Sequence, residues 1–199
     1  MVSLWQAHLS FVLLGFVLLS TFRFSAPWRP WWLPILAAVS FIPVNELPLA
    51  AYMRSFTDDL ALSTVALLAW VALSRLGVVQ PLGRQHQVQL LTLFGVLSLL
   101  LYPATLGLTY YDPYRWGFNP RPMIVLVGAL ALLMLWLRNS LAVWMLAIGT
   151  LAFALRLKVS ENYWDYLVDP LLTGYCLVAG FGLLIGAAWR PLLKWHRGQ

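Results

Sequence analysis

The seven acidic residues of this chain lie in three short polar segments, and long apolar stretches separate those segments. The acids are Glu46, Asp58, Asp59, Asp112, Glu161, Asp165 and Asp169. The polar segments that alternate with them hold basic residues and no acid, namely Arg23, Arg29, Arg75, Arg84, Arg138, Arg190, Lys194 and Arg197. A soluble protein has no reason to sort its charges in this way, whereas a polytopic membrane protein retains its basic loops in the cytoplasm. The pattern therefore predicts a membrane protein whose acidic segments face outward.

The composition agrees with this interpretation. Apolar residues make up 61% of the chain, charged residues make up 10%, and the mean hydropathy is +0.78. Ordinary globular domains are about 45–50% apolar and about 25% charged. The net charge of +6 lies in loops that flank apolar stretches, where it contacts anionic headgroups, so nucleic acid is not an expected partner. Residues 1–199 are predicted to form one integral membrane domain.

Candidate spans follow from the apolar stretches, since a spanning helix needs about 20 apolar residues. They cover residues 4–21, 32–53, 58–74, 88–108, 123–137, 141–157 and 170–189. We predict an all-α, polytopic transmembrane bundle of about seven spans in the inner membrane, with an external N-terminus and a cytoplasmic C-terminus. The second span is the least regular, because Pro34, Pro43 and Pro48 interrupt it. If it breaks into a re-entrant segment, the number of spans changes.

The external segment 158–170 is the richest in ionisable residues. Glu161, Asp165 and Asp169 are four residues apart, so they would share one face of a helix. Glu161 and Asp165 are candidate catalytic residues, and Trp164 is a candidate for binding a substrate. The alternative is a solvated helix end at the membrane surface. The pair Asp169-Pro170 is typical of the start of the last helix in either case.

The external segment 45–60 contains Glu46, which apolar residues flank. An ionisable residue inside a membrane is costly and suggests a function. We expect Glu46 to be shielded from water and paired with a basic group such as Arg54 or Arg115, for a functional or a structural reason. Asp58 is predicted to cap the following helix and to form an i,i+4 pair with Arg54.

The external segment 110–122 surrounds Asp112 and Arg115 with aromatic side chains, among them Tyr111. Arginine binds phosphate through two parallel hydrogen bonds, and neighbouring rings can line a lipid or a sugar. Arg54, Tyr111, Asp112, Arg115 and Trp164 are therefore the candidate binding residues. The alternative is an ordered interfacial loop held by an Asp112–Arg115 contact. Because brief loops join the predicted helices, we expect the three external segments to meet in space.

The sequence carries no motif for zinc, haem, a serine nucleophile or a phosphate-binding loop, so no cofactor and no metal site are predicted. A divalent cation bound by carboxylates stays open, since Mg²⁺ and Ca²⁺ take oxygen ligands.

Three functions fit these features. The first is a non-catalytic membrane subunit whose external polar and aromatic surface binds a lipid headgroup, a lipid-linked glycan or a partner protein of the membrane or periplasm. The second is a small membrane transferase or hydrolase that acts on a lipid-linked phosphate at the periplasmic face, with Glu46, Glu161 or Asp165 as acid or base. The third is a proton- or ion-coupled carrier that uses Glu46. If the function lies where the external segments converge, Arg115→Ala or Asp165→Ala should abolish it and leave membrane insertion intact, whereas Arg84→Ala should change little.

Overall fold

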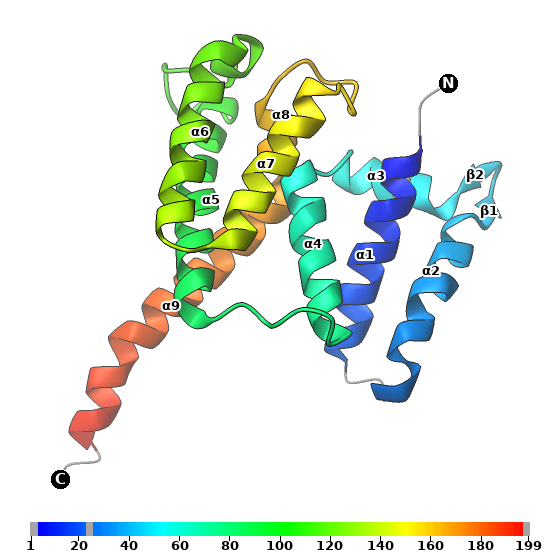
Figure 1. The fold of residues 1–199 in the computed structure, drawn as a ribbon, viewed down its shortest axis with the longest axis horizontal. Helices are drawn as coiled ribbons and strands as arrows, with labels where there is room; N and C mark the ends of the chain where they lie inside the picture. Colours follow the sequence, from blue (N-terminus) through cyan, green and yellow to red (C-terminus); the bar gives the residue numbers. More distant parts are fainter. Residues whose placement is uncertain (1–3, 23–25, 197–199) are drawn as a thin grey trace.

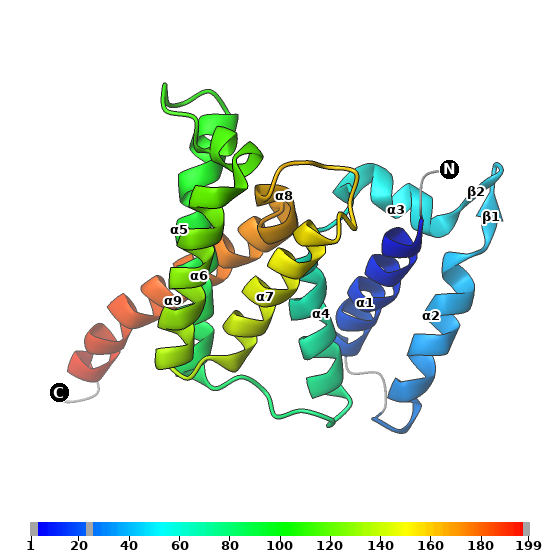
Figure 2. The same ribbon diagram turned by 45° about the horizontal axis from the view of Figure 1, so that its top comes forward.

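The chain folds into a helical bundle in which successive long helices run back and forth between two ends (Figures 1 and 2). The computed structural model describes residues 4–22 and 26–196. The α-helices are α1 (Trp5–Thr21), α2 (Trp32–Ser40), α3 (Leu49–Thr57), α4 (Leu62–Arg75), α5 (Arg84–Thr105), α6 (Pro120–Trp136), α7 (Ser140–Ala154), α8 (Trp164–Leu167) and α9 (Pro170–His196). Two 3-10 helices, η1 (Ala26–Trp31) and η2 (Pro113–Phe118), and one small hairpin join them. The prediction of an all-α fold is confirmed, because the hairpin strands have two residues each.

Helices α1, α4, α5, α6, α7 and α9 form close to the positions that the apolar stretches predict. Within the described residues, α5 is the one helix that is both long enough, at 22 residues, and apolar enough to cross a membrane by itself. Helices α1, α4, α6 and α7 and the part Pro170–Gly186 of α9 are also apolar but have 10–17 residues.

The predicted second span, residues 32–53, is not one helix. Helix α2 ends at Ser40, and the strands β1 (Pro43–Val44) and β2 (Leu47–Pro48) then form an antiparallel hairpin that leads into α3. Pro43 and Pro48 have no backbone N–H, so they cannot donate the hydrogen bonds that a continuous helix needs here. Between the strands, Asn45 and Glu46 both have positive φ, at 46° and 69°. Positive φ at both central residues is the backbone of a two-residue hairpin turn.

The loops divide the bundle into an acidic end and a basic end. The acidic end comprises segments 41–61, 106–119 and 155–169 and holds all seven acidic residues; α3, η2, α8 and the hairpin lie there (Figure 1). The basic end comprises η1, the linker 76–83 and the turn 137–139, which carry no acid. The sorting of charge in the sequence therefore becomes a sorting between two ends of the fold.

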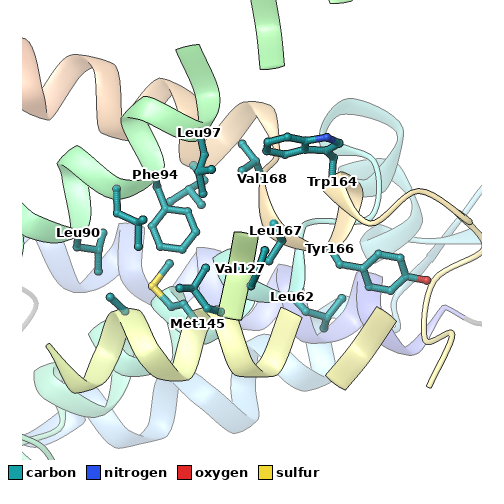
Figure 3. Close-up of a cluster of buried hydrophobic side chains, with 14 of the residues drawn as sticks. Leu62, Leu90, Phe94, Leu97, Val127, Met145, Trp164, Tyr166, Leu167 and Val168 are labelled. Carbon is teal, nitrogen blue, oxygen red and sulfur yellow. The ribbon is translucent and has the colours of Figure 1, made fainter. Parts of the chain in front are cut away.

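Two groups of buried side chains make up the core. The larger lies among α5, α6, α7, α8 and α9 and includes Phe94, Met145 and Leu167 (Figure 3). The smaller joins α1, α2 and α4 around Phe16. Helix α4 packs against both α1 and α7, so it connects the two groups. Gly149 lets α8 lie close to α7, because a Cβ there would be 3.0 Å from the carbonyl oxygen of Tyr166.

Candidate functional site

Lys158 is the residue at which two segments of the acidic end meet. Its Nζ donates hydrogen bonds to the carbonyl oxygen of Asp59, at 2.5 Å, and to that of Asp165, at 2.8 Å. Burial lowers the pKa of the Lys158 ammonium below its ordinary value, and the negative charges of Asp165, Asp58, Asp59 and Asp169 act in the opposite direction. The ammonium thus ties the linker between α3 and α4 to the start of α8.

Asp165 links the third segment to the same place. Its carboxylate accepts a hydrogen bond from the Tyr114 hydroxyl, at 3.1 Å from Oδ2, and another from the Ser160 hydroxyl. Burial and the neighbouring Asp165 charge raise the pKa of Tyr114 to about 12. The three acidic segments therefore do meet, as the short loops predict, and Lys158 and Asp165 are where they meet.

Asn162 and Trp164 hold η2 against the segment before α8. The Asn162 side chain donates to the carbonyl oxygen of Tyr114, at 2.9 Å, and the Trp164 indole N–H donates to that of Pro113, also at 2.9 Å. Trp164 is completely buried, and Figure 3 shows it beside Val168 at the edge of the core. The Trp164 ring, predicted as a substrate contact, thus lies in the protein core and supports η2.

Asn162 is a structural residue that the sequence analysis missed. It is completely buried, and a Cβ on Gly117 would lie only 1.7 Å from its Oδ1. Position 117 therefore needs a glycine because two segments approach closely there, and not because its backbone has a positive φ. The glycine within the aromatic segment 110–122 was the available signal, although it does not name the partner.

The segment 158–169 does not form the helix that would align its carboxylates. Only Trp164–Leu167 is helical, and the three acids lie in different surroundings. Glu161 is exposed, Asp165 is half-buried and Asp169 is buried. The prediction of one shared helix face is therefore wrong, because the helix covers only Trp164–Leu167 and leaves Glu161 and Asp169 outside it.

The predicted role of Asp169 is confirmed. Its Oδ1 accepts from the amide of Leu172 at 2.7 Å, which caps the start of α9. Its Oδ2 also accepts from the amide of Ala61 at 2.8 Å, next to the start of α4. One buried carboxylate therefore fixes the first turns of two helices that are far apart in the sequence.

Both predicted roles of Asp58, as a helix cap and as the partner of Arg54, are wrong. Asp58 lies at the end of α3 with φ of 55°, and the residue before α4 is Ala61. Arg54 pairs instead with Asp59, with 2.8 Å between Nη2 and Oδ2. The left-handed backbone at Asp58 ends α3 and turns the next side chain, not its own, toward Arg54.

Glu46 is not shielded from solvent. It lies exposed in the turn of the hairpin at the acidic end, and among the described residues it has no ion pair and no side-chain hydrogen bond. The prediction of a buried, paired carboxylate is wrong. The two prolines around it form hairpin strands that carry it away from the bundle, so it does not lie at depth.

Tyr111, Asp112 and Arg115 form an exposed part of the acidic end. The rings of Tyr111 and Trp116 meet edge to face, with 5.6 Å between centroids. Asp112 caps η2 by accepting from the amide of Tyr114 at 3.0 Å. The expected Asp112–Arg115 contact is not an ion pair, because Arg54–Asp59 is the one ion pair in the part of the chain that the structure describes.

A cavity of about 430 Å³ opens beside this network, where α6 and α7 reach the acidic end. Its apolar wall includes Phe118 and Phe153, and its polar wall includes Arg156, Ser160 and Glu161. Arg156 has a positive φ of 51° and forms no ion pair with any described acid. Neither Glu46 nor Arg115 lines this cavity. A guanidinium, a hydroxyl and aromatic rings therefore face one open space.

No protein-family model, curated protein or solved structure matches this chain. Among the described residues, no three His, Cys, Asp or Glu side chains are grouped so that they could hold a metal ion.

Proposed function

We propose that this chain is a seven-pass inner-membrane protein whose acidic end faces the periplasm. Seven helices, α1, α2, α4, α5, α6, α7 and α9, connect the two ends in alternating directions (Figures 1 and 2). Basic loops are retained in the cytoplasm, which assigns that side to the acid-free end. The outward-facing side chains of these helices are largely apolar, for example Val125 and Val178 with 72% and 76% exposure, as a lipid surface requires.

The short helices fit this placement when the interfacial segments are included. Helix α7 has 15 residues and is about 22 Å long, whereas the hydrocarbon core is about 30 Å thick. At the acidic end, η2 packs against α5 and α6, and the buried α8 packs beside α7, so these segments add protein to that end of the bundle. A reporter enzyme that works only in the cytosol should be active when it is fused after Gln199. Activity of a periplasmic reporter at that position would refute the topology.

We further propose that the acidic end binds an amphipathic ligand with a phosphate headgroup, without catalysing a reaction. The observation that carries this proposal is the cavity in which Arg156 faces aromatic rings. Arginine suits phosphate because its planar fork matches two oxygens at once. The rings of Phe118 and Phe153 suit the apolar part of the same ligand, since the cavity opens beside the ends of α6 and α7. The membrane supplies such ligands directly.

The hydrogen bonding of the acids supports binding more than catalysis. Asp165 accepts hydrogen bonds from two hydroxyl groups of the protein, and it does not line the cavity in which a substrate would bind. Glu46, the basis of the carrier hypothesis, lies exposed in a hairpin turn. One observation favours an enzyme as the second candidate, because Glu161 lines the same cavity as Arg156. A carboxylate beside a phosphate clamp could act as acid or base.

The test compares phosphatidic acid with diacylglycerol, which lacks the phosphate, for binding to the purified protein in lipid nanodiscs. Arg156→Asn removes the guanidinium, and asparagine tolerates the left-handed backbone at this position. Loss of a hydrogen bond to a charged group costs about 1.5–3 kcal/mol, so phosphatidic acid should bind roughly 10- to 100-fold more weakly. Diacylglycerol binding should not change.

Arg121→Asn is the matched control, because Arg121 is also exposed at the acidic end but does not line the cavity. It should bind phosphatidic acid as the unmodified protein does. Equal losses in both variants would contradict the proposed site. Release of inorganic phosphate that disappears in Glu161→Gln would instead establish the enzyme.

A further inference from the structure

Two arginines at the basic end lie together without an acidic partner. Arg29 Nη1 donates to the carbonyl oxygen of Arg75 at 3.1 Å, and Arg75 Nη1 donates to the Ser20 hydroxyl at 3.2 Å. Within the described residues, neither forms an ion pair, and the buried Nε of Arg29 has no hydrogen-bond partner. All acids lie at the opposite end of the bundle (Figure 1). The two guanidinium groups therefore keep unneutralised charge and spare donors.

Arg75 also closes one end of an apolar groove. The groove has a volume of about 290 Å³ and lies among α1, α4 and α9. Helix α4 contributes one continuous face from Thr64 to Arg75, while Val17 of α1 and Tyr175 of α9 form the walls. A helix rises about 1.5 Å per residue, so the groove is about 16 Å long. Its long axis follows the bundle, and its charged end is at the basic end.

We propose that this groove holds one acyl chain of an anionic phospholipid from the cytoplasmic leaflet, with Arg75 and Arg29 binding its phosphate. The combination of a long apolar groove and a cationic end matches a lipid with a negative headgroup. A free phosphate ion would use only the guanidinium groups and would leave the groove empty. The proposal depends on the membrane placement given above, but it does not depend on the cavity at Arg156.

The occupant follows from charge as well as from shape. Anionic lipids are attracted to basic groups at the cytoplasmic surface, and each nearby Arg or Lys contributes about 1 kcal/mol. Arg29 bonds the backbone carbonyl of Arg75, so both cations belong to the same part of the basic end, and a bound phosphate would neutralise charge that no described acid neutralises. A zwitterionic lipid carries a positive group beside its phosphate, so its attraction to the two arginines is weaker. The site should therefore prefer phosphatidylglycerol to phosphatidylcholine.

Native mass spectrometry of the full chain, released from nanodiscs with equal amounts of the two lipids, tests this proposal. The unmodified protein should retain phosphatidylglycerol preferentially. Arg75→Gln keeps a donor for Ser20 but removes the charge, and it should lower that preference about fivefold. Val17→Phe fills the groove while leaving both arginines in place, and it should reduce retention of both lipids.

Arg84→Gln is the control, because Arg84 is an exposed arginine at the basic end that does not line the groove. It should retain lipid normally. In a chain that already carries Arg156→Asn, adding Arg75→Gln should still lower the preference about fivefold, which separates this site from the one at the acidic end. Inorganic phosphate should not displace the lipid. The proposal is overturned by equal retention of the two lipids, by equal losses in Arg75→Gln and Arg84→Gln, by unchanged retention in Val17→Phe, or by displacement with inorganic phosphate.

Discussion

Replacing Asp169 should destabilise the bundle more than replacing any exposed acid. The Asp169 side chain is 5% exposed and accepts two backbone hydrogen bonds, from Leu172 at the start of α9 and from Ala61 before α4. These bonds join two helices that pack against different parts of the core. Asp169→Ala removes both acceptors at once and leaves the two amides without these partners.

The expected magnitude follows from the two bonds. Loss of a helix N-cap costs about 1 kcal/mol. The buried amide of Ala61 loses its acceptor, and a buried unsatisfied donor costs about 1–3 kcal/mol. The sum is about 2–4 kcal/mol for Asp169→Ala. Asp169→Asn keeps an oxygen that can cap α9 but places an amino group toward Ala61, so it should recover only the cap, about 1 kcal/mol.

The free energy of unfolding can be measured by denaturing titration of the purified protein in detergent micelles. Asp112→Ala is the control, because Asp112 also caps a helix but is exposed and serves only η2. We expect the order of stability to be unmodified protein, Asp112→Ala, Asp169→Asn and Asp169→Ala, from most to least stable. If Asp169→Ala and Asp112→Ala unfold at the same denaturant concentration, the reasoning from burial is wrong.

Two further predictions concern the segments joined at the acidic end. Gly117→Ala should fail to fold normally, because its Cβ would overlap Asn162, whereas Gly128→Ala should be tolerated, since nothing lies within 4 Å of a Cβ there; size-exclusion chromatography of both variants checks this. In the folded protein the pKa of Tyr114 is about 12, whereas its ordinary value is 10.0. Because the unfolded chain loses this proton first, the stability that Tyr114 contributes is complete below pH 10 and is lost as the pH rises toward 12. Tyr114→Phe should therefore reduce the fall in stability between pH 10 and pH 12, and a fall as steep as that of the unmodified protein would contradict the contact with Asp165.

Local signals in the sequence were sufficient for most of the helices and for one cap. Apolar stretches locate the long helices, because burial or lipid contact requires apolar side chains over whole turns. The Asp169-Pro170 pair locates the start of α9, because capping involves only neighbouring residues. The broken second span also had a local signal. Pro43 and Pro48 around Asn45 favour a turn, and this signal is stronger than the apolar character of the stretch.

Contacts between distant segments could not be predicted in the same way. Lys158 binds the carbonyl oxygen of Asp59, 99 residues away, and nothing in either segment specifies that partner. The pairing of Arg54 with Asp59 and not with Asp58 depends on a left-handed backbone at the end of α3. If α3 ended one residue later or earlier, a different carboxylate would face Arg54. Candidate site residues chosen by charge alone therefore include some that hold the fold together, such as Asp165, and others that are exposed, such as Glu46.

The buried and half-buried acids around Lys158 differ in availability from Arg156, which lines the neighbouring cavity. Asp59, Asp165 and Asp169 each accept hydrogen bonds or an ion pair from within the protein. A ligand cation would have to displace those donors and leave them unsatisfied. Arg156, in contrast, has no acidic partner among the described residues and faces a cavity. An anionic group can therefore bind Arg156 without breaking an internal ion pair, whereas a cation at Asp59, Asp165 or Asp169 would have to displace protein donors, and this contrast supports the proposal of an anionic ligand for the cavity.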